Sequence, residues 1–280
     1  MNNICAFGSA SVVCLFSMLG SYVIDGSKMF ALADSSSNTN QESVIVAADE
    51  EISSYKGEDK SDILVKGGSV SWMDLHDSAA ALIEKGEVGH VYLYDTSLLK
   101  LSGNRDDTSA SQSSSVSFVH LHDSAAASVK GGEISHVHLH DESSLKLSGT
   151  SEISHLTLND SSQSEISGGQ LSFLNLTDDS EAHVWLLDIE GGKFSTPEIS
   201  VSGGAITIEP GTALHIYGRE IRFADGKLSG IWANGTQFEF WLLRNTQKRR
   251  FWLFKGDEED RHTEIPSSLP KEVIFHQTKN

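Results

Sequence analysis

The chain has 280 residues, of which 38% are hydrophobic, 8% aromatic and 21% charged, and its formal net charge is −18. This large negative charge repels nucleic acid and anionic lipid, and we therefore expect neither as a partner. Cations and basic partners are electrostatically favoured. The modest apolar fraction suits a stack of thin repeats better than a thick layered core. The 24 glycines and four prolines suit frequent tight turns between unbroken strands.

The opening segment indicates export. An apolar stretch over residues 4–24 is followed by the small-residue pattern Ala31-Leu32-Ala33, which predicts a signal peptide over residues 1–33. An uncleaved N-terminal anchor is the alternative, because the first three residues lack Lys and Arg and the apolar run is long. Either way we predict an exported protein: extracellular, on the cell surface or in the periplasm. If the leader is cleaved, the mature chain has no membrane span.

The two cysteines, Cys5 and Cys14, both lie in this leader, so we expect a mature chain without disulfides. Residues 34–60 are mostly polar and are predicted to form a flexible spacer. Within the spacer, the run from Ser43 to Ala48 is a candidate first strand or cap.

Residues 61–213 are dominated by one repeated sequence motif, hydrophobic-x-Leu-x-Asp. Its copies are spaced by 18, 28, 18, 19 and 18 residues and end at Asp77, Asp95, Asp123, Asp141, Asp160 and Asp178. A step this short cannot hold a pair of helices, but it fits one coil of a stacked β structure. The longer step carries about ten extra polar residues, 104–113, which we expect to leave the coil as a surface loop without breaking the register.

Alternation within each copy predicts strands. Leu lies two residues before every Asp, an apolar residue lies four before, and Val, Ile or Leu lies seven before. A second apolar position follows six residues after the Asp, usually with Gly two or three residues later. We therefore predict an all-β fold, a single-stranded parallel β-helix (β-solenoid) of 18–19-residue coils, with right-handed coiling expected.

The last part of the chain changes in composition. Residues 214–254 are rich in Trp and Phe, and we predict that they form final coils and a C-terminal β cap over the open end of the stack. Residues 255–280 are predicted to be a charged tail.

Histidines give the most specific chemical signal. The outward positions of the third and fourth copies carry His120, His122, His136, His138 and His140. If the insertion loops out, these two strands are neighbours about 4.8 Å apart, and the imidazoles could hold one divalent ion such as Zn²⁺, Cu²⁺ or Ni²⁺. The alternative is that the five side chains simply stack on a solvent-facing sheet.

The Asp column has two interpretations. Asp is a turn former, because its carboxylate can accept local backbone hydrogen bonds. Stacked carboxylates could instead bind Ca²⁺, which we regard as less favoured, since the nonapeptide pattern of calcium-binding β-rolls is missing from the sequence.

Evidence for catalysis is thin, and an enzyme is the less favoured class. The sequence contains no Ser-His-Asp spacing, phosphate-binding loop or nucleophile elbow, so we assign no catalytic residue and no cofactor-binding residue. A carbohydrate-active enzyme is nevertheless a further alternative, for which Arg219 and Arg222 beside Glu220 could contribute to a cleft.

The 18–19-residue units with Gly-Gly turns resemble the β-helical repeats of bacterial haemagglutinin-like adhesins and autotransporter passengers. The stretch Ile216-Tyr217-Gly218, followed by residues 228–238, resembles a C-terminal element of exported bacterial repeat proteins. The resemblance spans roughly residues 61–245 and implies a surface protein that adheres to, or binds, an extracellular macromolecule or glycan. It carries over no catalytic residue. We expect no C-terminal translocator barrel, in contrast to autotransporters.

Overall fold

A computed structural model describes residues 43–103, 113–189, 193–195, 199–202, 204–245, 248–255, 258–260 and 264–278. The described residues form 22 strands and no helix. The predicted leader with both cysteines lies outside the described residues, as does most of the expected insertion loop, residues 104–112. The part of the chain that the structure describes therefore offers no helix with the length and apolar composition needed to span a bilayer.

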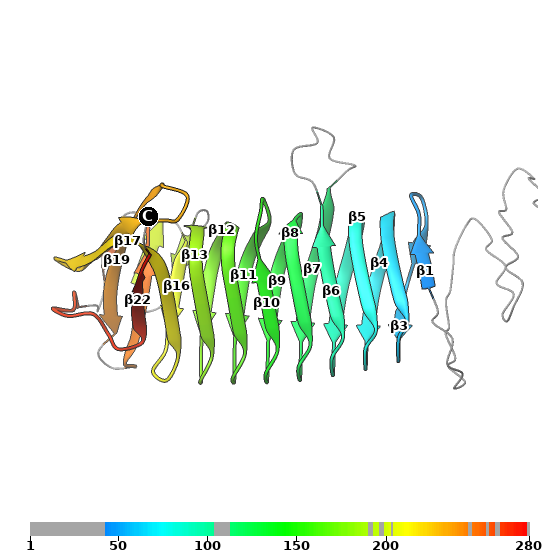
Figure 1. The fold of residues 1–280 in the computed structure, drawn as a ribbon, viewed down its shortest axis with the longest axis horizontal. Coiled ribbons are helices and arrows are strands. Elements are labelled where there is room, and N and C mark those ends of the chain that lie inside the picture. Colours follow the sequence, from blue (N-terminus) through cyan, green and yellow to red (C-terminus); the bar gives the residue numbers. More distant parts are fainter. Residues whose placement is uncertain are drawn as a thin grey trace, which may run out of the picture.

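Each copy of the repeat places a strand before its Asp, and these strands lie side by side (Figure 1). They are β4 (Asp62–Leu75), β5 (Ala80–Leu93), β7 (Ser114–Leu121), β9 (Glu133–Leu139), β11 (Glu152–Leu158) and β12 (Gln163–Leu176). Neighbouring strands pair in parallel, so that Leu121 lies opposite Leu93 on one side and Leu139 on the other. The register is therefore kept across the insertion, as predicted.

A second set of strands follows the Asp. It comprises β6 (Leu98–Ser102), β8 (Ala126–Gly131), β10 (Ser144–Leu147) and β13 (Glu181–Ile189), together with the first halves of β5 and β12. The predicted inward positions are buried in both sets. At each of the four apolar positions of the repeat, the side chain in every copy is at most 2% exposed. These columns form one continuous hydrophobic core.

The expectation of an open β-solenoid is wrong in how the sheet is connected. The hydrogen bonding forms a closed, eight-stranded parallel β-barrel. Its strands pair in a ring in the order β5, β7, β9, β11, β12, β10, β8 and β6, and β6 pairs with β5 again. The ring closes because β5 and β12 each continue through a corner for 14 residues and pair at both of their ends. The sequence places glycines at these corners, Gly86 and Gly168-Gly169, but does not reveal that strand pairing continues through them.

Every repeat Asp forms a tight turn. Asp77, Asp95, Asp123, Asp141, Asp160 and Asp178 all have φ between 55° and 58°, the left-handed region that Asp tolerates better than most residues. The residue two positions after each Asp is small and buried, either Ala or Ser, as at Ala125 and Ser143. The turn therefore leads directly into the core.

The array begins earlier than predicted. The described part of the expected spacer contains β1 (Ser43–Val46), β2 (Glu51–Ile52) and β3 (Tyr55–Gly57), all of which pair in parallel with β4. The candidate strand at Ser43 is confirmed, and this region is part of the sheet instead of a spacer. Asp59, with φ of 56°, is one more member of the Asp column. It escaped the sequence pattern because Gly57 occupies the position of the usual Leu.

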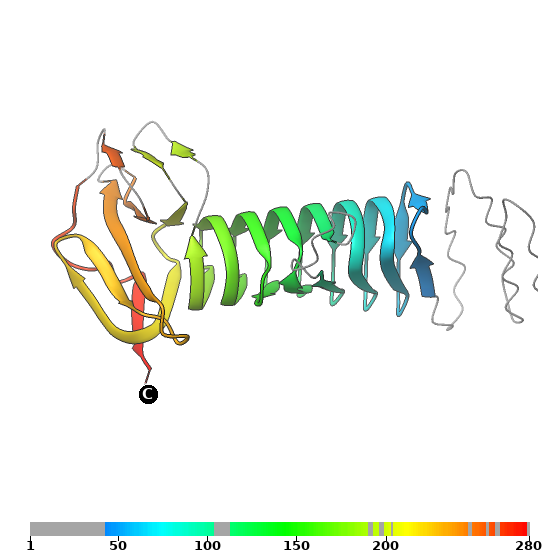
Figure 2. The ribbon, with the colours of Figure 1, turned by 90° about the horizontal axis from the view of Figure 1, so that it is seen from above.

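The C-terminal part changes to antiparallel pairing (Figure 2). After β16 (Ala205–Ile208), the strands β17 (Ala213–Ala224), β18 (Lys227–Ile231), β19 (Gln237–Asn245) and β20 (Arg250–Phe254) follow one another as antiparallel neighbours. Trp252 and Phe254 are buried with Ala205 and Leu243 in a separate small cluster. That these residues protect the end of the array stays a prediction.

The remaining strands complete this end. Strands β14 (Lys193–Ser195), β15 (Ile199–Ser202) and β21 (Glu258–Asp260) form a three-stranded antiparallel sheet. The predicted charged tail contains β22 (Val273–Gln277), which pairs in parallel with β17. Its Val273 is 4% exposed and belongs to the main core, so this part of the tail is an ordered strand.

Candidate functional site: a face of stacked histidine and aromatic rings

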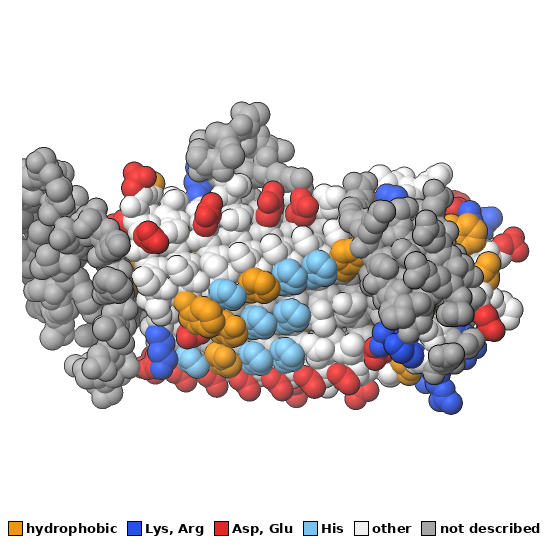
Figure 3. Space-filling view, turned by 180° about the vertical axis from the view of Figure 1, so that it is seen from behind, with side chains coloured by type: hydrophobic (Ala, Val, Ile, Leu, Met, Phe, Trp, Pro, Cys, Tyr) orange, Lys and Arg blue, Asp and Glu red, His pale blue; other side chains and the backbone are white. Residues whose placement is uncertain are grey.

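The predicted histidines lie on one face of the array. The outward positions five, three and one residues before each repeat Asp form three columns across the parallel strands β4, β5, β7, β9, β11 and β12. Figure 3 shows the His side chains of this face in rows that hydrophobic side chains continue, above a row of acidic side chains. We call these three columns the histidine face.

The rings of the histidine face stack on one another. The first column is Trp72, His90, Phe118, His136, His155 and Phe173, with ring centroids 4.6 to 4.8 Å apart. The second is Tyr92, His120 and His138, with centroids 4.8 and 5.1 Å apart. The third is His76, Tyr94, His122 and His140, with centroids 4.7 to 5.1 Å apart. These spacings follow the separation of paired strands.

Stacking determines which atoms a ligand can reach. Each ring inside a column has another ring against both of its flat faces, so mainly its edge is open to solvent. A sugar binds an aromatic residue through the flat face of the ring, and only a column end such as Trp72, 39% exposed, offers one. Histidine edges carry nitrogen atoms, so the interior of this face offers hydrogen-bonding and metal-binding groups.

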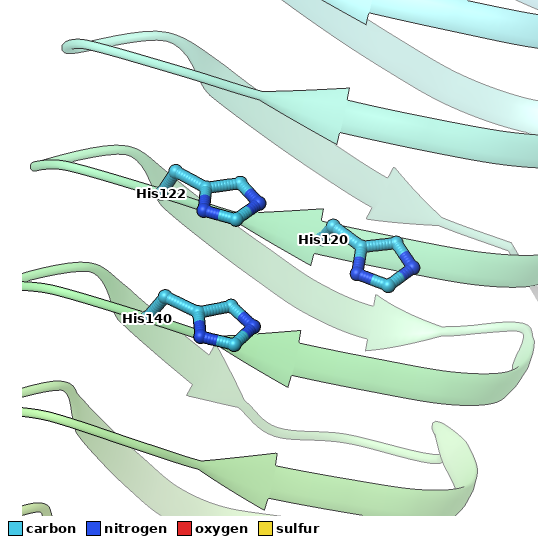
Figure 4. A group of neighbouring side chains, drawn as sticks. All are labelled: His120, His122 and His140. Carbon is cyan, nitrogen blue, oxygen red and sulfur yellow. The ribbon is translucent and has the colours of Figure 1, made fainter.

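The structure brings the five predicted metal-site residues onto this face, but groups only three of them closely. His138 lies beside His120, and His140 beside His122, as predicted. Nitrogen atoms of His120, His122 and His140 all lie within 4.8 Å of one another (Figure 4). His138 is stacked on His120 outside this group, and His136 stands in the first column between Phe118 and His155.

The environment favours neutral imidazoles. The pKa of His120 is lowered to about 4, first by burial and then by the neighbouring His138, His122, His140 and His90. Burial and neighbouring histidines also lower the pKa of His122 and His138. At neutral pH these side chains therefore carry a free nitrogen lone pair, which is the form that binds metal ions.

The Asp column borders the face and has a structural role. The carboxylate of each repeat Asp accepts the backbone N–H of the Asp one copy earlier, as in Asp77 to Asp95 and Asp123 to Asp141, both at 3.0 Å. The bonds thus join adjacent copies, whereas the sequence suggested local bonds within one turn. Because one oxygen of each carboxylate, Oδ2, accepts a backbone hydrogen bond, the turn interpretation has direct support. The calcium interpretation stays a prediction.

A second cluster was missed by the sequence interpretation. Glu181, His183 and His215 come from β13 and β17 and offer ligand atoms within 4.8 Å of one another. His183 lies opposite His215 across the two strands, and Glu181 lies opposite Ala213. Glu181 and His215 are 34 residues apart in the sequence, where the repeat spacing is lost. The recurring apolar-His-apolar pattern of Ala182-His183-Val184 and Leu214-His215-Ile216 is the signal that could have aligned them.

A shallow depression of about 530 Å³ adjoins this cluster. It is lined by His183, Trp185 and Tyr217 and by the Lys146–Glu165 ion pair, together with residues of β8 and β10. Arg219 and Arg222, considered for a carbohydrate-active cleft, instead flank an irregularity in the pairing of β17 with β18 and do not line this depression.

Comparison with known proteins does not identify a relative. No protein-family model, curated protein or solved structure matches the chain.

Proposed function

We propose that the protein is an exported binding protein whose histidine face takes up divalent transition-metal ions at His120, His122 and His140. The observation that carries this proposal is the grouping of three imidazole nitrogens within 4.8 Å of one another. Imidazole is a preferred ligand of Zn²⁺, Cu²⁺ and Ni²⁺. The net charge of −18 attracts cations to the surface.

Binding requires a small rearrangement of the rings. In a tetrahedral zinc site the ligand nitrogens lie about 3.3 Å apart, as follows from Zn–N bonds of about 2.0–2.1 Å. The rings of His122 and His140 are 4° from parallel with centroids 4.9 Å apart, so their lone pairs run side by side. Both side chains are about a third exposed, at 31% and 34%, and can tilt toward a shared ion.

Calorimetric titration of the full-length protein with Zn²⁺ and Cu²⁺ tests the proposal. The variant His120→Ala/His122→Ala/His140→Ala should lose one bound ion per chain. His90→Ala is the matched control, because His90 is on the same face but outside the group of three, and it should bind as the wild type does. Equal binding by the triple variant and the wild type would contradict the proposal.

Export is a separate part of the proposal and rests on the apolar segment before Ala33. Fractionation of the native host checks it. Mature protein that has lost residues 1–33, found outside the cytoplasm, supports export. Full-length protein found soluble in the cytoplasm contradicts it.

A second candidate function is adhesion to an extracellular macromolecule or glycan. The exposed ring of Trp72 at the end of the first column favours it. This ring is stacked on His90 and Tyr92 of the next copy, and the described residues place no further ring of the first column beyond it. Glycan-array binding that is lost in Trp72→Ala and kept in the triple histidine variant would support this function independently of metal.

A further inference from the structure

We propose that Glu181, His183 and His215 form a second binding site for a divalent transition-metal ion, separate from the histidine face. The three residues lie in strands β13 and β17 near the C-terminal end of the array (Figure 1). They are in the strands after the repeat Asp, whereas the histidine face is built by the strands before it.

The ligand atoms converge on one point. Oε1 of Glu181 lies 3.0 Å from Nε2 of His183 and 2.7 Å from Nε2 of His215. Both imidazole nitrogens are therefore directed at the same oxygen atom. The rings of His183 and His215 are stacked, with centroids 4.5 Å apart and planes 10° from parallel, so they must tilt to share an ion, as His122 and His140 must. The difference is that a carboxylate oxygen already lies within contact of both ring edges in the second cluster.

The other nitrogen of each histidine is also held. Nδ1 of His183 lies 2.9 Å from the hydroxyl of Tyr217, and Nδ1 of His215 lies 2.8 Å from Nε2 of His276. Metal-binding histidines characteristically have such a second partner, which fixes the orientation of the ring and the position of its proton. The cluster thus has both the ligands and the outer partners of a metal site.

The partners can serve two protonation patterns. A carboxylate only accepts hydrogen bonds, so hydrogen bonding of His183 and His215 to Glu181 requires a proton on Nε2 of each ring. Their Nδ1 atoms then accept hydrogen bonds from Tyr217 and His276. A tyrosine hydroxyl and a neutral imidazole can each also accept a bond. Both histidines can therefore move the proton to Nδ1 and free Nε2 for a metal ion.

The charges around the cluster suit a cation. Burial, followed by the neighbouring His183, lowers the pKa of His215, while Glu181 opposes this shift. Burial and Glu181 raise the pKa of Tyr217, so its hydroxyl keeps its proton. An ion between the two Nε2 atoms would receive the negative charge of Glu181 directly.

Two nitrogen ligands and one carboxylate oxygen are a ligand set that Zn²⁺ accepts, with a further position for water or a bound molecule. His183 and Tyr217 also line the depression that contains Trp185, so that position lies next to a partly aromatic surface. The chemical class of ligand is a divalent ion of the Zn²⁺, Co²⁺ or Ni²⁺ type.

The experiment uses the full-length protein with the histidine-face substitutions His120→Ala/His122→Ala/His140→Ala as background, so that the two metal proposals are tested separately. Calorimetry with Zn²⁺ should give one ion per chain. Glu181→Gln and His215→Gln should each abolish this binding. His276→Gln should weaken it by roughly 10- to 100-fold, as loss of an outer partner does elsewhere. Glu165→Gln is the matched control, because this carboxylate pairs with the His183 position but lies outside the cluster, and it should leave the affinity unchanged.

A measurement on the unsubstituted cluster guards against variants that fail to fold. Long-range ¹⁵N–¹H NMR spectra report which imidazole nitrogen carries the proton. With Zn²⁺, the signals of His183 and His215 should change from the Nε2–H to the Nδ1–H pattern. Retention of Nε2–H at saturating Zn²⁺ would show that the cluster is a hydrogen-bonded network only and would overturn the proposal.

Discussion

The backbone N–H of Asp123 donates a hydrogen bond to Oδ2 of Asp141 at 3.0 Å, and the same oxygen lies 4.0 Å from Nδ1 of His122. One carboxylate thus joins two copies of the repeat and borders the histidine face. The same relationship recurs at Asp160, which accepts the N–H of Asp141 and lies 3.8 Å from His140. The row of exposed aspartates therefore stabilises the stack, although stacked carboxylates by themselves repel one another.

Substitutions at Asp141 can separate its two roles, hydrogen-bond acceptor and left-handed residue with φ of 58°. Asp141→Ala loses both and should lower the free energy of unfolding by about 1–3 kcal/mol. Asp141→Asn keeps an acceptor oxygen and tolerates this φ, so it should cost less than about 1 kcal/mol. Asp141→Gly should fall between them. Urea denaturation of the three variants checks this order, and equal effects of Ala and Asn would contradict it.

The close approach of backbone segments at the corners predicts that adding a side chain at a corner glycine destabilises the fold. A Cβ atom at Gly131 would lie 1.7 Å from the carbonyl oxygen of Gly103, so Gly131→Ala must separate two copies of the repeat. We expect a loss of more than about 3 kcal/mol or failure to fold. Gly235→Ala is the comparison: φ there is 90°, but a Cβ would meet nothing within 4 Å, so only conformational strain of about 1–2 kcal/mol is expected. Thermal unfolding distinguishes the two, and similar midpoints would be inconsistent with the close approach.

The buried columns of apolar side chains predict a large loss of stability when one of their Leu residues is shortened. Leu139 is fully buried between its counterparts Leu121 and Leu158. Leu139→Ala should therefore lower the free energy of unfolding by about 2–5 kcal/mol, through lost burial and the cavity left behind. Leu98→Ala is the control, since Leu98 lies in the same array but remains partly exposed, and it should cost clearly less. A smaller loss at Leu139 than at Leu98 in denaturant titrations would contradict the assignment of the core.

The sequence was sufficient to identify the core positions and the pairing register, because Leu and Asp recur at constant offsets and a one-residue slip would expose every Leu. It was insufficient for the closure of the sheet, because Lys85-Gly86 has the composition of a turn although β5 continues through it. Tertiary pairing at both ends of the strand overrides this local preference.

The two candidate sites differ in how far the sequence could predict them. His120 and His138 were predictable as neighbours, because both lie three residues before a repeat Asp. Glu181 and His215 were not, because the chain between them departs from the repeat and returns to pair with β13 only in the folded structure. A repeat of constant length predicts which residues are neighbours only in the part of the chain where that length is maintained.

The histidine face predicts how stability depends on pH in metal-free buffer. The pKa of His120 is about 4 in the folded protein against an ordinary value of 6.5, because of burial and the neighbouring histidines. Between these two pH values the unfolded chain binds more protons than the folded protein, so acid favours unfolding. The contribution of His120 is therefore complete above about pH 6.5 and is lost progressively as the pH falls toward 4. His122, His138 and His155, whose pKa values are also lowered, act in the same direction, while Asp141 and Asp123 oppose the effect at His122.

Urea unfolding at pH 7.5 and pH 5.0 measures this dependence, with the free energy of unfolding expected to be lower at pH 5.0. His120→Gln removes the most strongly shifted group, so its free energy of unfolding should differ less between the two pH values than that of the wild type. His76→Gln is the control from the end of the third column and should preserve the wild-type difference. If His120→Gln and the wild type lose the same stability between pH 7.5 and pH 5.0, the histidine face is not the origin of the acid sensitivity.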